Sequence, residues 1–233
     1  MPQHPRTLLA LVSAAALAAV VLTACATPAP AAAPSSAPPA AATPTPTAST
    51  PPAAVPAELV VTSSGVELYD SVGALVDSFE WPDETADALA VLELAFGPAP
   101  APTVRIGDSG HYSDVEEYAF AGGFTYFSAI NLGKPRDEYF LPSSVQVDTG
   151  EQINGVSIRT ADGLQVGGTL ADVQALAPPR QYDHPLGIAY LVDPEVPSLV
   201  FSADEATDMV AAIVDPDGTL MRLIAPYPSQ IFF

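Results

Sequence analysis

Three side chains of this sequence invite a chemical interpretation: the thiol of Cys25, and a pairing of the Ser109 hydroxyl with the His184 imidazole. A thiol can be alkylated, oxidised to a disulfide or bound to a metal ion. Cys25 is the only cysteine, which excludes an internal disulfide and a cysteine-rich zinc site. A serine can act as a nucleophile when a nearby base such as histidine takes its proton.

Cys25 stands at the end of a segment with a secretory pattern. The chain begins with a short basic stretch that includes Arg6, and an uncharged run rich in Leu, Ala and Val follows over Leu8–Leu22. Two small residues, Thr23 and Ala24, then precede the cysteine. This order is typical of a signal peptide with an apolar run of about 7–15 residues. A helix that crosses about 30 Å of hydrocarbon needs a longer run, of roughly 20 residues.

The sequence Leu22-Thr23-Ala24-Cys25 resembles the lipobox of bacterial lipoproteins. The resemblance implies cleavage before Cys25, transfer of diacylglycerol to its sulfur and acylation of the new amino terminus, for example with palmitate. Each buried methylene contributes roughly 0.8 kcal/mol, so two or more acyl chains hold a protein stably at a bilayer. We therefore expect residues 1–24 to be a lipoprotein signal peptide. The mature chain is expected to be extracytoplasmic and lipid-anchored to the outer face of the cell membrane.

Residues 25–57 are expected to form a disordered stalk between the lipidated cysteine and a domain. After Cys25 this segment is almost entirely Ala, Pro, Thr and Ser, without charged or aromatic side chains. Frequent prolines disfavour helix and strand, and little apolar surface is available to offset the entropy of ordering. At about 3.1 Å per residue, the extended reach is on the order of 100 Å.

Residues 58–233 are expected to be a single globular domain, and their charge is strongly negative. The chain has 27 Asp and Glu against seven Lys and Arg, a formal net charge of −20. Every acidic residue lies at or beyond Glu58, so the negative charge belongs to the domain. Such a surface repels phosphate groups, so nucleic acid is not an expected partner. The charge is expected to keep the domain soluble outside the cell, and a preference for cationic partners or metal ions is the alternative.

The segment around Ser109 permits a hydrolase hypothesis. Gly107-Asp108-Ser109 resembles the nucleophile segment of trypsin-like proteases and of hydrolases of the SGNH type. In the trypsin-like group the base histidine precedes the serine, but no mature histidine precedes Ser109. In the SGNH type the base lies in Asp-x-x-His, whereas here Asp183 directly precedes His184, and the Gly-x-Asn-Asp block is absent. A secreted serine hydrolase using Ser109 and His184 remains an alternative.

Metal and cofactor chemistry is not expected. His111 and His184 are the only mature histidines, and neither has ligand spacing around it. Asp215-x-Asp217-Gly218 shares letters with a calcium loop, but no glutamate follows at the required distance, so a hairpin turn is predicted. No glycine-rich phosphate loop or dinucleotide fingerprint is present.

The pattern of short β-rich runs separated by turns predicts an α+β fold, with a mainly antiparallel sheet of short strands and two helices. One helix is expected between Pro82 and Gly97. The other is expected to start at Thr169, with Asp172 completing a variant of the capping box. The expected strands are 58–62, 66–70, 75–81, 103–106, 116–120, 124–130, 139–147, 155–160, 186–192, 199–202, 208–214 and 220–224.

Two further patterns bear on the architecture. Gly65-Val66-Glu67-Leu68 precedes the first helix and Gly155-Val156-Ser157-Ile158 precedes the second, which suggests a duplicated strand-turn-strand-helix unit. A cluster of aromatic residues is expected to pack in the core, with a ligand groove as the alternative. Its members are Tyr112, Tyr118, Phe120, Phe124, Tyr126 and Phe127.

Two resemblances go beyond the lipobox. The lipobox, the stalk, the bias of arginine over lysine and the acidic domain together resemble surface lipoproteins of high-GC Gram-positive bacteria. In addition, residues 166–176 are similar to the start of small envelope modules of the outer-membrane-assembly lipoprotein and β-lactamase-inhibitor-protein type. That similarity implies short helices packed on antiparallel sheets and a role in binding proteins.

These observations favour a membrane-anchored lipoprotein whose domain is a non-enzymatic module that binds a protein or a cell-wall component. Lipidation at Cys25 is the one site that the sequence assigns. The alternatives are the serine hydrolase and a solute-binding lipoprotein. A solute-binding lipoprotein normally has two α/β lobes and a longer chain.

Overall fold

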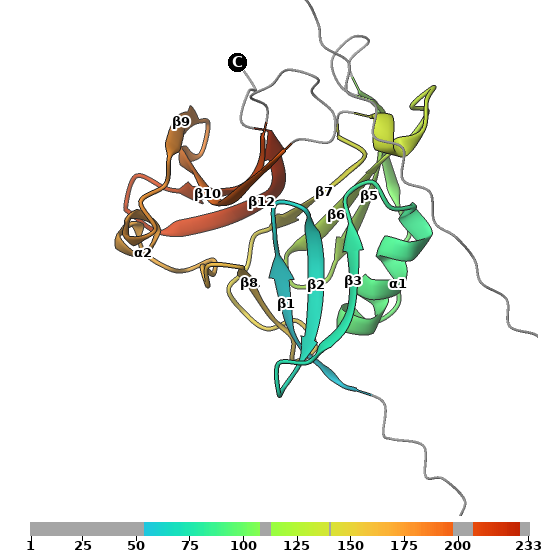
Figure 1. Ribbon diagram of the computed structural model, residues 1–233, viewed down its shortest axis with the longest axis horizontal. Coiled ribbons are helices and arrows are strands. Elements are labelled where there is room, and N and C mark those ends of the chain that lie inside the picture. The colour runs from blue at the N-terminus through green and yellow to red at the C-terminus, as the bar shows by residue number, and fades with distance from the viewer. Residues whose placement is uncertain (1–53, 108–112, 140, 198–206, 229–233) are drawn as a thin grey trace, which may run out of the picture. The chain divides into compact units, whose positions relative to one another are not determined.

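Strands dominate the structure, which is a computed structural model that describes residues 54–107, 113–139, 141–197 and 207–228 (Figure 1). Contacts between Cα atoms divide the chain into units 1–49 and 50–233, and all described residues belong to the second unit. The described strands form two mostly antiparallel sheets, accompanied by two α-helices. The expectation of a sheet-rich chain with two helices is confirmed.

Sheet A has four strands in the order β3-β2-β1-β8. The first three form the predicted antiparallel meander, and β8 joins β1 in parallel, with Ile158 opposite Leu59. Parallel neighbours need a long crossover, and here the crossover contains α1 and half of sheet B. The strands are β1 Pro56–Val61, β2 Gly65–Asp70, β3 Leu75–Glu80 and β8 Ser157–Thr160.

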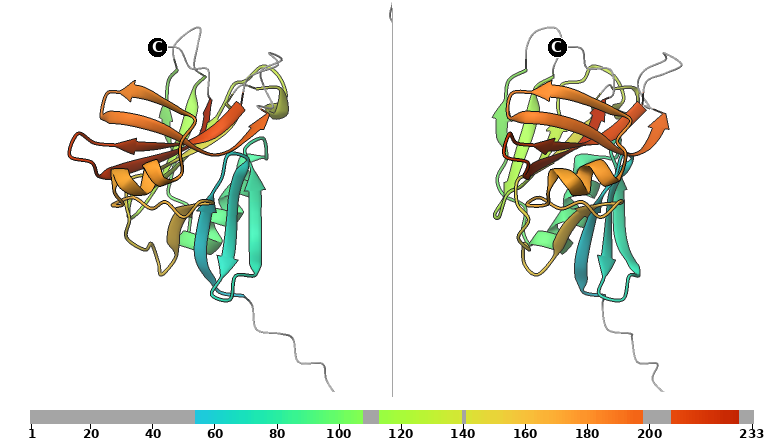
Figure 2. Two further views of the ribbon diagram at one scale, coloured as in Figure 1. Left: turned by 60° about the vertical axis from the view of Figure 1, so that its left-hand side comes forward. Right: turned by 90° about the vertical axis from the view of Figure 1, so that its left-hand side faces the viewer.

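Sheet B has eight strands in the order β4-β5-β6-β7-β12-β11-β10-β9, all paired antiparallel. Strands β4–β7 form one group and β9–β12 form another. The pairing of β12 with β7 joins the two groups into one sheet (Figure 2). The strands are β4 Thr103–Arg105, β5 Val115–Phe120, β6 Phe124–Ala129, β7 Ser143–Val147, β9 Arg180–His184, β10 Gly187–Pro197, β11 Thr207–Val214 and β12 Leu220–Pro228.

Both predicted helices form. The first, α1, spans Thr85–Phe96 and ends at Gly97, whose φ of 87° favours glycine. The second, α2, spans Leu170–Ala175 and begins with the predicted capping box. The Thr169 hydroxyl accepts the Asp172 N–H at 3.3 Å, and the Asp172 carboxylate accepts the Thr169 N–H at 2.8 Å.

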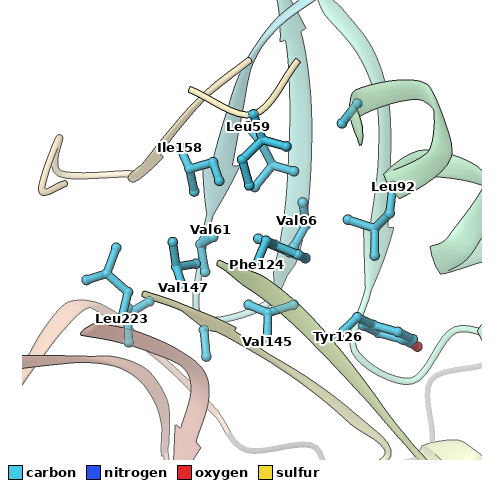
Figure 3. Packing of buried hydrophobic residues seen from close by; sticks show 14 of the residues in the cluster. Leu59, Val61, Val66, Leu92, Phe124, Tyr126, Val145, Val147, Ile158 and Leu223 are labelled. Atoms are coloured by element: carbon cyan, nitrogen blue, oxygen red, sulfur yellow. The ribbon is translucent and has the colours of Figure 1, made fainter. Parts of the chain in front are cut away.

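The main hydrophobic core lies between sheet A, α1 and the facing side of sheet B. Figure 3 shows Leu59, Val61 and Val66 of sheet A pointing toward Phe124 and Val145 of sheet B. Four members of the predicted aromatic cluster belong to this core, which confirms packing as their role, and Tyr112 lies outside the described residues. Those four are Tyr118, Phe120, Phe124 and Tyr126. The sixth member, Phe127, lies half-buried on the opposite face of the sheet.

The suggested duplication is not matched by the structure. The first lead-in sequence lies in β2, which continues through a turn into β3 and then α1. The second leads into β8, but residues 161–169 form turns and loop rather than a second strand before α2. The strand-turn-strand-helix unit is therefore complete only once. The difference follows from the glycine-rich stretch before Thr169, because glycine disfavours strand formation.

The outer edge of β3 is capped by carboxylates. Along β3, Phe79 and Trp81 are the residues whose backbone N–H groups face β2 and its turn. The N–H groups of the alternate residues, Ser78 and Glu80, therefore point away from β2. The Asp77 carboxylate accepts the Ser78 N–H at 2.9 Å, and the Asp83 carboxylate accepts the Glu80 N–H at 2.8 Å. Capped N–H groups and negative charge both oppose pairing with another chain.

We predict that the double variant Asp77→Ala, Asp83→Ala will self-associate more than the wild type, because both changes free an edge N–H group and remove repulsion. Sedimentation velocity at rising protein concentration measures the effect. The control is Asp87→Ala, which removes one exposed carboxylate from α1 and leaves the edge unchanged. Equal sedimentation of the double variant and the wild type would contradict the edge-protection role.

Candidate functional site

Of the three residues in the lipidation and hydrolase hypotheses, the structure describes only His184. Cys25 and Ser109 lie outside the described residues, whereas His184 ends β9. The Nδ1 atom of His184 accepts the Leu186 N–H at 3.2 Å, so this nitrogen stabilises the β9–β10 turn. Partial burial, together with the positive charge of Arg222, lowers the pKa of His184.

The described neighbours of Ser109 lie far from His184. Gly107 follows β4 and Ser113 precedes β5, at one edge of sheet B, whereas β9 forms the opposite edge with six strands between β4 and β9. Neighbouring strands are about 4.8 Å apart, so β4 and β9 are separated by roughly 30 Å along the sheet. Figure 1 shows β5 and β9 on opposite sides of the fold. This geometry gives no support to a Ser109–His184 catalytic pair.

The Asp215–Gly218 segment forms the predicted hairpin turn between β11 and β12. The Asp215 carboxylate accepts the N–H groups of Asp217 and Thr219 at 3.0 and 2.9 Å, and Gly218 has a φ of 87°. The Asp215 carboxylate therefore accepts hydrogen bonds within its own turn. Across the described residues, no group of three or more His, Cys, Asp or Glu side chains is arranged to hold a metal ion.

Among the described residues, no helix is both long enough and apolar enough to cross a membrane.

Among the described residues, a groove of about 720 Å³ lies between α2 and the loops before it. Glu151, Asp162 and Asp172 contribute carboxylates to its lining, and the remaining lining residues are uncharged. Hydrogen bonds from Thr169 lower the pKa of Asp172 and keep its carboxylate at the helix cap. The groove thus offers acceptors without a nucleophile–base pair, which suits a ligand with N–H donors or positive charge. The groove was not predicted from the sequence, because its lining comes from two loops and from α2.

A second groove, of about 430 Å³, lies on the outer face of sheet B beside β4. Its walls include Val115 and Phe127, with the Arg105 guanidinium 5.4 Å from the Phe127 ring centroid. Arg105 also pairs with Glu117 at 2.6 Å, so the charges in this groove are locally balanced. This groove suits an apolar side chain.

Two groups of hydrogen bonds, which lie side by side at the Ser128–Ser143 pair and are here together called the polar seam, join the two sheets. Asp193 of β10 accepts the Ser63 N–H at 2.6 Å, and the Trp81 indole donates to the Ser63 carbonyl at 2.9 Å. The Ser143 hydroxyl donates to the Trp81 carbonyl at 2.6 Å, and Ser143 lies opposite Ser128 in the β6–β7 pair. The seam comprises Asp193, Ser63, Trp81, Ser143, Ser128, Thr85 and Arg136.

Arg136 closes the seam at the start of α1. It lies in the 3-10 turn η1, Arg136–Glu138, which the sequence did not reveal. Its guanidinium donates to the carbonyls of Asp83, Ala129 and Pro142 and to the Ser128 hydroxyl at 2.8–3.3 Å. Arg136 therefore acts as a structural clamp, because its N–H groups are occupied by the chain itself.

Sequence periodicity could not identify the seam, since serine and aspartate are usually exposed. Of the five polar residues that are buried in the described part of the chain, four belong to it: Ser63, Ser128, Ser143 and Asp193. One signal was present in the sequence. Asp193 follows directly on the apolar run of β10 and precedes a proline, which is an unusual position for a carboxylate inside a strand.

The Tyr126 hydroxyl lies beside the seam without joining it. The side chain is fully buried, and among the described residues its hydroxyl makes no hydrogen bond of regular geometry. Burial raises the pKa of Tyr126, and the rise is opposed by the charge of Arg136 and by polar contacts with the hydroxyls of Ser143, Ser128 and Thr85. A buried hydroxyl without a partner destabilises a protein by about 1–3 kcal/mol.

We predict that Tyr126→Phe will raise the free energy of unfolding by about 1 kcal/mol, because the ring packing stays and the unpaired hydroxyl goes. Urea denaturation measures this change. The matched control is Tyr118→Phe, at the directly opposite position in β5, where the lost hydroxyl donates to Glu116 at 2.7 Å. That control should be neutral or destabilising. A loss of stability in Tyr126→Phe would mean that its hydroxyl has a stabilising partner.

Comparisons of the sequence with protein-family models and with curated proteins, and of the structure with solved structures, found no significant match.

Proposed function

We propose that the chain is an exported lipoprotein, held at the outer face of the cell membrane by a diacylglyceryl group on Cys25, and that its domain is a non-enzymatic binding module. The observation that carries the anchoring is the order of an uncharged run, two small residues and the only cysteine, with a Pro-rich stalk behind it. In this proposal the stalk presents the domain to a protein or a cell-wall component.

The binding role is supported by the two grooves. The carboxylate-lined groove beside α2 suits a partner that offers N–H donors or positive charge, and the net charge of −20 adds long-range attraction for such a partner. The groove beside β4 offers Val115 and Phe127 to an apolar side chain. The same negative charge opposes nucleic acid as a partner.

Metabolic labelling with a palmitate analogue tests the anchor. The wild type should incorporate the label, Cys25→Ala should not, and the stalk variant Ser35→Ala should label like the wild type. Label retained in Cys25→Ala would refute lipidation at this residue. A fluorophosphonate probe tests the other half of the proposal, because labelling that Ser109→Ala abolishes would establish a serine hydrolase instead.

A further inference from the structure

The strand β4 lies at one edge of sheet B and is exposed along its whole length. The side chains of Val104 and Ile106 are 52 % and 73 % exposed. These two apolar residues are two positions apart, so they lie on the same face of the strand. An exposed edge with apolar side chains is a place at which a second chain can pair with a sheet.

The pairing of β5 determines which backbone groups of β4 point outward. The Asp114 carbonyl accepts the Ile130 N–H at 2.8 Å, so the even-numbered residues of this segment bond toward β6 and the odd-numbered residues bond toward β4. Among the odd-numbered partners on β4 are Thr103 and Arg105. The N–H and carbonyl groups of Val104 therefore point away from the sheet, and no described residue bonds to them.

The outward groups of Val104 and Ile106 are here called the β4 edge. The Asp114 carboxylate accepts the Gly107 N–H at 3.0 Å on the β5 side, so the alternation continues and Ile106 also points outward. Pro102 has no N–H group, so the edge offers no donor before Val104. The outer edge of β3 is capped by carboxylates, whereas among the described residues no side chain caps the β4 edge.

One face beside the β4 edge is acidic. Glu116 lies directly opposite Val104 in β5, so both side chains share this face. The Glu116 carboxylate accepts the Tyr118 hydroxyl at 2.7 Å and has no described basic partner. A residue added opposite Val104 would start about 10 Å from Glu116, two strand spacings away, and a lysine side chain can reach across this gap with its stem on Val104.

The other face beside the β4 edge is apolar. The groove of Val115 and Phe127 begins here, beside the side chain of Arg105. The guanidinium of Arg105 is already paired with Glu117 at 2.6 Å, so this face offers apolar surface without an unpaired charge. An added strand that alternates basic and apolar residues would therefore match both faces.

We propose that the β4 edge binds an extended segment of a partner protein as an additional antiparallel strand, with basic side chains toward Glu116 and apolar side chains toward Phe127. This inference rests on the proposed binding role of the domain and specifies the chemistry of its partner. Main-chain hydrogen bonds to Val104 and Ile106 supply the attachment, and the alternating side chains supply the specificity. The net charge of −20 attracts a basic segment and repels a second copy of the chain.

Binding of a fluorescent peptide of alternating lysine and valine to the full chain, measured by anisotropy, tests the proposal. Val104→Pro removes an outward N–H that β5 does not use, so the fold should be kept while binding weakens about tenfold or more. Val104→Thr keeps the N–H and the branched shape, and should bind like the wild type. Failure of the wild type to bind the peptide, or equal binding by Val104→Pro, would overturn the proposal.

Backbone-methylated peptides test the same hydrogen bonds on the unaltered protein. In antiparallel pairing, the peptide residues opposite Val104 and Ile106 direct their N–H groups toward β4, and in the proposal these residues are the lysines. Methylation of the lysine backbone nitrogens should abolish binding, whereas methylation of the valine nitrogens should preserve it. Equal effects of the two methylations would overturn the assignment of the edge.

Charge variants separate this inference from the proposed function. Glu116→Gln keeps the acceptor for Tyr118 and should weaken peptide binding severalfold at low salt, whereas Asp87→Asn on the exposed side of α1 should not. Peptide binding that persists in Val104→Pro but is lost in Asp162→Asn would move the site to the carboxylate-lined groove, which overturns strand addition and leaves the binding role standing. Dimers that Val104→Pro abolishes would make a second copy the occupant and also overturn the proposal.

Discussion

Replacement of Cys25 by alanine is expected to remove the mature-size protein from the membrane fraction almost completely. The thiol is the only group in the chain that can take a diacylglyceryl modification through a thioether. Each acyl chain contributes roughly 0.8 kcal/mol per buried methylene, and one chain binds only marginally, whereas two or more bind stably. In the proposed processing, loss of the sulfur prevents both the modification and the cleavage that would follow it at this position.

Fractionation and immunoblotting measure this outcome. The variant should be found either in the soluble fraction or as a precursor that keeps residues 1–24. Thr23→Ser is the matched control, because it keeps a small residue before the cleavage point and should be processed and retained like the wild type. Cys25→Ala protein that is cleaved to mature size and still held at the membrane would show that the anchor lies elsewhere.

Local patterns predicted most individual elements of the domain. The alternation in β1–β3, the capping box of Thr169 and Asp172, and the turn after Asp215 each depend on a few neighbouring residues. The strand β9 was missed because Arg-Gln-Tyr-Asp-His lacks the β-branched pattern that marks a strand. Hydrogen bonding to β10 holds β9 in an extended conformation that its own residues do not strongly favour. The predicted strand 199–202 lies outside the described residues.

The arrangement of these elements in space was much harder to predict from the sequence. The division into two sheets and the parallel pairing of β1 with β8 depend on contacts between residues about 100 positions apart, which periodicity does not report. The grooves and the polar seam share this dependence, because their side chains come from loops and strands that only the tertiary fold brings together. The Ser109–His184 hypothesis shows the converse, since residue types alone suggested the pair, whereas sheet order places the described neighbours of Ser109 at the opposite edge of sheet B from His184.

The division of β6 into an inner and an outer face leads to the second large prediction. Phe124 is fully buried and packs at an angle against Phe96 and Phe120, with ring centroids 4.9 and 6.2 Å away. Phe127, three residues later in the same strand, lies on the outer face and is half-buried. Alternation along a strand places residues at odd spacing on opposite faces, so these two phenylalanines form a natural pair for comparison.

We expect Phe124→Ala to lower the free energy of unfolding by about 3–5 kcal/mol, because it removes the ring and leaves a cavity where α1 meets sheet B. A domain of ordinary stability unfolds with about 5–15 kcal/mol, so this loss is a large fraction of the total. Phe127→Ala should lower it by about 1 kcal/mol, because part of that ring already contacts water. Urea denaturation of both variants measures the difference. Equal losses would contradict the assignment of the two faces of β6, and with it the placement of the core between the sheets.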